Sequence, residues 1–119
     1  LVVHGKGEQT RDFVYIDDVI EGMVAAATAP GINRLVINIG SGVATSLLDL
    51  AKLVLEVTGS SSEWILKEDQ DAGPSHMCAD IKLAKSRLGY QARVHLAEGL
   101  RRMLARDPRF QRPAGPAPA

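Results

Sequence analysis

The chain has 119 residues, of which 45% are hydrophobic and 24% charged, a balance typical of one modest globular domain. Its 14 basic and 14 acidic side chains cancel, which argues against a nucleic-acid or membrane-surface partner. The single cysteine, Cys78, excludes an internal disulfide and is expected to be a small buried side chain. Since no apolar run is long enough to span a bilayer and no signal-peptide pattern is present, we expect a cytoplasmic protein.

The first forty residues alternate short apolar runs with glycine turns. LVVHG at 1–5 predicts a strand, and FVYI at 13–16 predicts a second short strand or extended segment. The apolar residues then recur at threes and fours, which predicts a helix that Asp17 or Asp18 caps. The run LVINIG at 35–40 is short and β-branched, so we expect a further strand.

The clearest helix of the sequence follows. Ser46 with Asp49 three residues later forms a capping-box-like start, and Gly59 is placed to end the helix. Trp64 to Leu66 predicts a strand. The segment DQDAGPSHMC at 69–78 has no apolar period, and we expect an ordered loop of the kind that often carries binding groups.

Two helices are predicted near the C-terminus, one that Asp80 caps and Gly89 ends, and one from about Leu96 to Ala105. We therefore expect an α/β lobe at 1–106 and a disordered Pro/Ala-rich tail at 107–119. Few short strands with helices mainly on one face would leave an apolar face uncovered, which suggests a lobe of a larger protein.

The loop GSGVAT partly matches a dinucleotide-binding fingerprint. Gly40 and Gly42 occupy its first two glycine positions after a predicted strand, but Thr45 stands where the third position needs Gly or Ala. Two interpretations stay open: a loop whose backbone amides face an anion, and a plain strand-to-helix turn.

No self-contained catalytic or metal centre is predicted. The histidines His4, His76 and His95 lie in different segments without metal-ligand spacing. The sequence lacks a GxSxG elbow, and Cys78 has no evident base partner. Any function therefore depends on binding or on a further part of the protein.

Three motifs carry a family resemblance: GKGEQTRDFVYIDDVIEGMVAA, then NIGSGVATSLLDLAKLVLEVTG, then HMCADIKLAKSRLGYQARVHLAEGL. Together, from about Leu1 to Met103, they resemble the C-terminal portion of nucleotide-sugar epimerases and dehydratases of the extended short-chain dehydrogenase/reductase family, UDP-glucose 4-epimerase among them. The resemblance implies a small substrate-binding lobe whose parent adds a Rossmann domain that binds NAD or NADP. The family's glycine-rich cofactor motif and YxxxK pair do not occur here, so we expect no cofactor and no turnover from this chain alone.

The resemblance also implies a set of substrate-binding residues. Arg11 matches the arginine of an RDF-type motif that contacts the substrate diphosphate, and a guanidinium suits phosphate as a planar, permanently charged fork. Val2 and His4 match positions beside the nucleotide base, and Asn38 matches one near the substrate pocket. The alternative for Val2 and Asn38 is ordinary sheet packing, and for His4 an ordinary strand-end side chain.

Two features depart from the family pattern, and one of them is that the expected Gly-Asp pair reads Ala72-Gly73. Gln70 stands where relatives usually carry a second diphosphate-binding arginine, and loss of that charge would weaken binding by roughly 1 kcal/mol or more. Lys67 or Lys82 could compensate. His76 keeps the family register four residues before Asp80, with either a binding or a structural role.

The resemblance favours the nucleotide-diphosphate-sugar binding part of an NAD(P)-dependent epimerase or dehydratase that acts through a 4-keto sugar. The alternative is a non-catalytic nucleotide-binding or protein-interaction module of the same descent. The expected partners are a nucleotide-diphosphate sugar and the missing Rossmann domain. We expect the fragment to be a monomer and its parent a homodimer.

Overall fold

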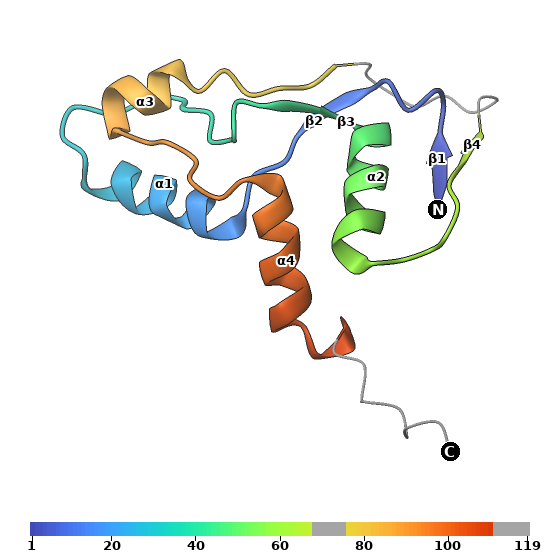
Figure 1. Cartoon of the computed structure of the whole chain (residues 1–119). Coiled ribbons are helices and arrows are strands. Elements are labelled where there is room, and N and C mark those ends of the chain that lie inside the picture. The colour runs from blue at the N-terminus through green and yellow to red at the C-terminus, as the bar shows by residue number, and fades with distance from the viewer. Residues whose placement is uncertain (68–75, 111–119) are drawn as a thin grey trace.

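The computed structural model describes residues 1–67 and 76–110. In this part of the chain, four short strands, four α-helices and one 3-10 helix follow one another in a mixed order, which confirms the expected α/β fold. Figure 1 shows α1, α2 and α4 below the β2–β3 pair, with α3 above α1 and the β1–β4 pair beside α2. None of the helices in these two ranges is long and apolar enough to cross a membrane.

The strands form two separate pairs. In the first, β1 (Val2–His4) pairs in parallel with β4 (Ile65–Lys67). In the second, β2 (Thr10–Asp12) pairs antiparallel with β3 (Ala44–Ser46), so that Arg11 faces Thr45 across the ladder. Each strand has three residues, and the arrangement of the chain therefore depends strongly on contacts outside the sheets.

The helices agree closely with the sequence periodicity. They are α1 (Ile16–Thr28), α2 (Leu47–Thr58), α3 (Lys82–Leu88) and α4 (Leu96–Arg106), followed by the 3-10 helix η1 (Pro108–Phe110). Residues 108–110 belong to the expected tail, and 111–119 lie outside the described residues.

The predicted start and end of α2 are confirmed. Ser46 Oγ accepts a 3.0 Å hydrogen bond from the backbone N–H of Asp49 and donates one of 2.6 Å to the Asp49 carboxylate. Gly59 adopts a left-handed φ of 62° directly after the helix. Such a conformation is cheap only for a residue without a Cβ, which explains glycine at the point where the helix ends.

The predicted cap of α1 was wrong. The helix starts at Ile16, and the residue at its N-cap position is Tyr15, whose side chain forms no capping hydrogen bond. Asp18 is instead almost buried, with 2% of its surface exposed, and its two carboxylate oxygens accept 3.0 Å hydrogen bonds from the N–H groups of Arg93 and Val94. The carboxylate therefore joins α1 to the segment that precedes α4, because buried backbone donors need acceptors.

Two predicted strands differ in the structure. The segment 13–16 was predicted as a strand or an extended segment. It is not a strand, since the second strand lies before it at Thr10–Asp12, but Tyr15 has an extended backbone and Ile16 begins α1. Residues 35–40 carry no strand assignment either. Val36 in this run is 88% exposed. A β-branched run forms a strand only where a neighbouring backbone supplies hydrogen-bond partners, and none of the described residues does so at 35–40.

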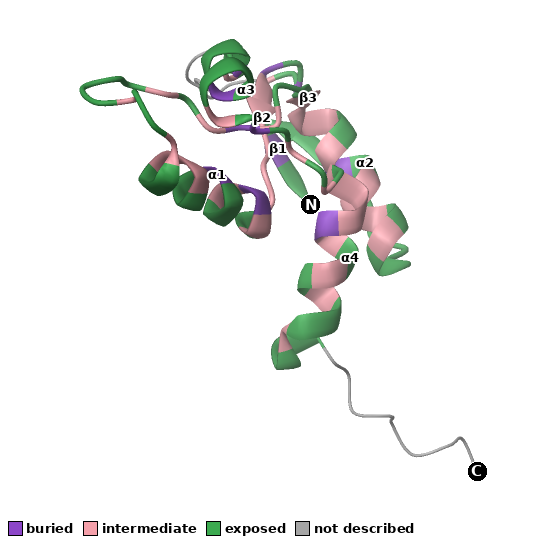
Figure 2. Cartoon of the chain, turned by 90° about the vertical axis from the view of Figure 1, so that its left-hand side faces the viewer, coloured by how far each residue is buried: buried purple, intermediate pink, exposed green. Residues whose placement is uncertain are grey.

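The buried core is small. Ile81, Ala84 and Tyr90 form one cluster around α3, and in Figure 2 the buried positions are few and scattered over the ribbon. One face of α1 leaves large apolar side chains exposed: Ile16, Ile20, Met23 and Val24. The expected uncovered apolar face was that of the sheet, whereas this stripe lies on a helix.

Candidate functional site

Three of the six predicted substrate-binding residues line one open cavity of about 520 Å³. Arg11 comes from β2, Asn38 from the extended run before the glycine loop, and His76 from the segment that leads to α3. These positions are far apart in the sequence and are brought together only by the fold. The remaining wall is formed in equal parts by residues 77–80 and by Asp12, Val14, Ile39 and Gly40.

Arg11 is held against the backbone of its own strand. Its Nη1 donates a 2.7 Å hydrogen bond to the carbonyl oxygen of Thr10, and the side chain is half-buried. The same carbonyl accepts a 3.1 Å hydrogen bond from the N–H of Met77. One backbone oxygen thus ties both the arginine side chain and the opposite wall of the cavity to β2.

His76 lies beside the same point of β2. Its Nδ1 is 3.3 Å from Thr10 Oγ1, and the two residues form a parallel β-bridge. Thr10 therefore contacts the cavity wall with both backbone and side chain. This contact fixes His76 in the wall of the cavity that Arg11 also lines.

Asn38 lines this cavity and also a neighbouring one of about 490 Å³. Lys82, one of the two lysines considered as a compensating cation, lines the neighbouring cavity. Its Nζ is 3.6 Å from the Asp80 carboxylate, and both side chains are largely exposed.

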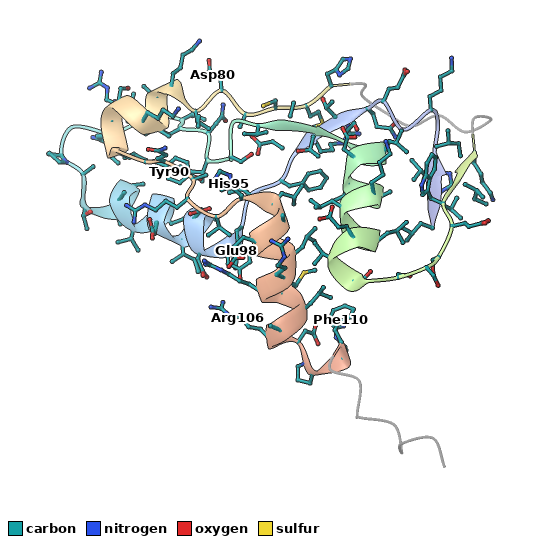
Figure 3. All side chains as sticks on the ribbon, viewed as in Figure 1. Asp80, Tyr90, His95, Glu98, Arg106 and Phe110 are labelled. Atoms are coloured by element: carbon teal, nitrogen blue, oxygen red, sulfur yellow. The ribbon has the colours of Figure 1, made fainter. Side chains whose placement is uncertain are left out.

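Figure 3 shows Asp80 on the outer side of the segment just before α3. Asp80 Oδ1 also accepts a 3.0 Å hydrogen bond from the N–H of Lys82, the first residue of α3, but the residue at the N-cap position is Ile81 and not the predicted Asp80.

Val2 and His4 are not among the described residues that line this cavity. Val2 and His4 lie on β1, where they pair with Ile65 and Lys67 of β4. Their position agrees with the alternative of ordinary sheet and strand-end residues. Gln70 falls outside the described residues.

Asp12 is a residue that sequence reasoning missed. Its Oδ1 accepts hydrogen bonds from the N–H of Ser41 (2.8 Å) and from Ser41 Oγ (2.5 Å), while its Oδ2 accepts from the N–H groups of Gly42 (2.9 Å) and Ala79 (3.1 Å). Burial alone would raise the pKa of this carboxyl, but the four hydrogen bonds outweigh burial and lower it. The one sequence feature that could have pointed to Asp12 is the glycine loop at 40–42, because its backbone amides are suited to bind an anion.

The loop GSGVAT therefore has an anion partner within the chain. The N–H groups of Ser41 and Gly42 are both directed to the Asp12 carboxylate. These amides do not fit the pyrophosphate of a dinucleotide, because a second anion would have to displace the first. The interpretation as an amide loop that faces an anion is correct, with an internal carboxylate as that anion.

The prediction that Cys78 is buried was wrong. The side chain is exposed and lines the cavity, with Sγ 3.9 Å from Asp12 Oδ2. Partial desolvation and the nearby negative charge of Asp12 raise the pKa of this thiol. A raised pKa lowers the thiolate fraction, which makes a nucleophilic role for Cys78 unfavourable.

A larger cavity, of about 660 Å³, lies between residues 13–16 and α4. Phe13, Tyr15, Leu100 and Met103 give it an apolar lining. Figure 3 shows His95 at the upper end of α4 and Arg106 at its lower end. None of the predicted site residues that the structure describes lines this cavity, which shares only Val14 with the described lining of the candidate binding site.

Comparison with known proteins agrees with these features. A family model described as GDP-mannose 4,6 dehydratase matches residues 1–103. UDP-glucuronic acid decarboxylase 1 of Arabidopsis thaliana is 33% identical over 88% of this chain and 24% of its own length. The UDP-glucose 4-epimerase of Thermotoga maritima, solved with UDP-glucose, is 35% identical with a TM-score of 0.77 over 85% of this chain and 32% of that one. The UDP-glucuronic acid 4-epimerase of Bacillus cereus, solved with UDP-glucuronic acid and NAD, is 39% identical with a TM-score of 0.76 over 84% of this chain and 32% of that one.

The fold and the family match define the class of protein as an NAD-dependent epimerase/dehydratase of the extended short-chain dehydrogenase/reductase type. Within that class, the chain belongs to the GDP-mannose 4,6 dehydratase family. It spans between a quarter and a third of the relatives named above.

Proposed function

We propose that residues 1–106 bind the nucleotide-diphosphate part of a nucleotide sugar, as a portion of an NAD-dependent epimerase or dehydratase. The observation that carries this proposal is the convergence of Arg11, Asn38 and His76 on one cavity. All three residues were selected by their resemblance to family positions at the substrate, and they come from three separate segments of the chain.

The chemistry of the cavity suits a diphosphate. A guanidinium binds phosphate oxygens through charge-assisted hydrogen bonds, which are roughly twice as strong as neutral ones. Asn38 and His76 add neutral hydrogen-bonding groups to the same walls. Two similar structures were solved with UDP-glucose and with UDP-glucuronic acid, which supports a nucleotide sugar as the ligand class.

The role of this part in catalysis would be positional. Contacts to a remote nucleotide diphosphate orient the reacting sugar and supply binding energy for that orientation. Because the amides of the loop at 40–42 already bind Asp12, we do not place NAD on them. In this proposal the cofactor and the proton-transferring groups for a 4-keto intermediate belong to another part of the enzyme, and the chain alone is inactive.

The test is a titration of the 119-residue chain with UDP, dTDP, GDP and UDP-glucose, followed by NMR shift changes or calorimetry. We expect weak binding of one nucleotide and its loss in Arg11→Ala. Arg93→Ala is the matched control, because Arg93 forms an exposed 3.8 Å ion pair with Glu21 away from the cavity. Equal affinity of the two variants would contradict a diphosphate contact by Arg11.

The alternative is a non-catalytic module that binds a protein partner. The apolar cavity beside α4 and the exposed stripe on α1 favour this alternative, since large exposed apolar patches commonly mark interaction surfaces. The same titration distinguishes the two functions, because the module would bind none of the nucleotides through Arg11. We propose that the isolated chain is a monomer, and a stable dimer in light scattering would contradict this.

A further inference from the structure

Asp12 stands next to Arg11 in β2, and its carboxylate accepts four hydrogen bonds at the cavity. Its carboxylate joins three segments, namely β2, the loop at 40–42 and the segment at 78–80. From this geometry we propose that Asp12 is a positioning residue, which holds the two flanking segments in place so that the cavity around Arg11 keeps its shape. The inference rests on the proposed function, because it concerns the same cavity.

The bonding pattern distinguishes Asp12 from a ligand-binding group. A carboxylate beside a diphosphate site would repel the ligand if its charge pointed freely into the cavity. Here both oxygens accept hydrogen bonds, three of them from backbone N–H groups at 2.8, 2.9 and 3.1 Å. The backbone N–H groups stabilise the negative charge of the carboxylate, and the carboxylate in turn supplies the acceptor that each N–H group needs. The bonds are charge-assisted because the acceptor is ionised.

The packing around the carboxylate is close. A Cβ built on Gly40 would lie 2.7 Å from Asp12 Oδ2 and 2.7 Å from the Cβ of Ala79. The loop can therefore approach the carboxylate and the 78–80 segment only because residue 40 has no side chain. Gly40 and Ala79 both line the cavity, so a shift of the carboxylate would move two of its walls.

The chain supplies a matched control in Asp18. This carboxylate also joins distant segments through two backbone hydrogen bonds, and it is almost fully buried, but it lies outside the residues that line the cavity. A general loss of stability should therefore be as large in Asp18→Asn as in Asp12→Asn. Only a loss of positioning at the cavity should be specific to Asp12.

The first measurement compares UDP and UDP-glucose affinities of the wild-type chain, Asp12→Asn and Asp18→Asn under conditions where urea titration shows each to be folded. An Asn amide can accept from one side but must turn an NH₂ group toward the donors on the other side. We expect Asp12→Asn to weaken binding about tenfold, the effect of losing roughly one charge-assisted contact, and Asp18→Asn to bind as wild type. Unchanged affinity in Asp12→Asn, or equal losses in both variants, would overturn the inference.

The second measurement needs no ligand. In the wild-type chain, the amide NMR shifts of Ser41, Gly42 and Ala79 should change together, with one common midpoint, as acid protonates Asp12. Separate midpoints, or no change at Ala79, would overturn the inference. The two measurements also distinguish a failure of the proposed function from a failure of the role of Asp12. If the wild-type chain binds no nucleotide, the proposed function fails. The common midpoint still decides whether Asp12 couples the two segments.

A milder variant guards against misfolding of Asp12→Asn. Ser41→Ala removes the 2.5 Å bond from Oγ to Asp12 and the local contacts of Oγ with the N–H (3.1 Å) and carbonyl oxygen (3.4 Å) of Val43. The three backbone donors to Asp12 stay in place. We expect a shift of the common midpoint toward higher pH, because one bond that favours the charged carboxylate is lost. An unchanged midpoint would contradict the proposed network.

Discussion

The phenol of Tyr90 donates a 2.8 Å hydrogen bond to the carbonyl oxygen of Gly40, fifty residues earlier in the chain. Tyr90 is only 5% exposed and packs with Ile81 and Ala84 in the core cluster; Figure 3 shows it near α3 and α1. The bond holds the start of the glycine loop through the Gly40 carbonyl, whereas Asp12 holds the loop through the N–H groups of Ser41 and Gly42. The cavity around Arg11 is therefore connected to the core through the backbone of Gly40.

Replacing Tyr90 with Phe should destabilise the chain by about 1–3 kcal/mol, because the carbonyl of Gly40 would be left without this buried donor. Urea unfolding followed by circular dichroism measures the change. Tyr15→Phe is the control: its hydroxyl accepts a 3.2 Å hydrogen bond from Arg106 at an exposed position and should contribute less. An equal loss in the two variants would contradict the importance of the bond to Gly40.

Tyr90→Phe should also change how the stability of the chain depends on pH in the alkaline range. Burial, and then the negative charges of Asp18, Asp12 and Glu21, raise the pKa of Tyr90. A group whose pKa is raised on folding stabilises the protein fully below its unfolded pKa, about 10 for tyrosine, and loses this contribution as the pH rises through the folded pKa. Stability should therefore fall above about pH 10 in wild type and fall less steeply in Tyr90→Phe.

In acid, Asp12 should control part of the stability. Its lowered pKa means that its contribution is present above the unfolded pKa, about 3.9, and is lost as the pH falls through the folded value. We expect the stability of wild type to decline below about pH 4 and that of Asp12→Asn to decline less. Denaturant midpoints measured between neutral and strongly acidic pH test this, and parallel curves for the two proteins would contradict it.

Gly40→Ala should disturb both stability and the cavity. The added Cβ would overlap the Asp12 carboxylate and Ala79, each at 2.7 Å, at an expected cost of roughly 1–3 kcal/mol. Gly31→Ala is the control, because no atom lies within 4 Å of its added Cβ and only its φ of 71° is strained. We expect faster hydrogen exchange at the Ser41 and Gly42 amides in Gly40→Ala alone. Faster exchange in Gly31→Ala as well would indicate a general loss of stability.

Much of the local structure follows from the sequence alone. Apolar residues at threes and fours predicted α1, α2 and α4 to within a residue or two, and Ser46, Asp49 and Gly59 predicted how α2 begins and ends. These features depend on hydrogen bonds and side-chain contacts within a few residues. Motif resemblance also selected Arg11 and its neighbours, because family motifs keep residue identity and order.

Other features were decided only by tertiary contacts. The bonds from Asp12 to Ser41 and Ala79 join residues 29 and 67 positions apart, and Asp18 turned from an expected helix cap into an acceptor for Arg93 and Val94. The run at 35–40 has strand composition without a strand partner in the described residues. Sequence patterns determine which residues can cap, bind or pair, whereas the fold decides which distant donors and acceptors come within hydrogen-bond distance. The reason is that a carboxylate or strand edge is satisfied by whatever backbone the rest of the chain places beside it.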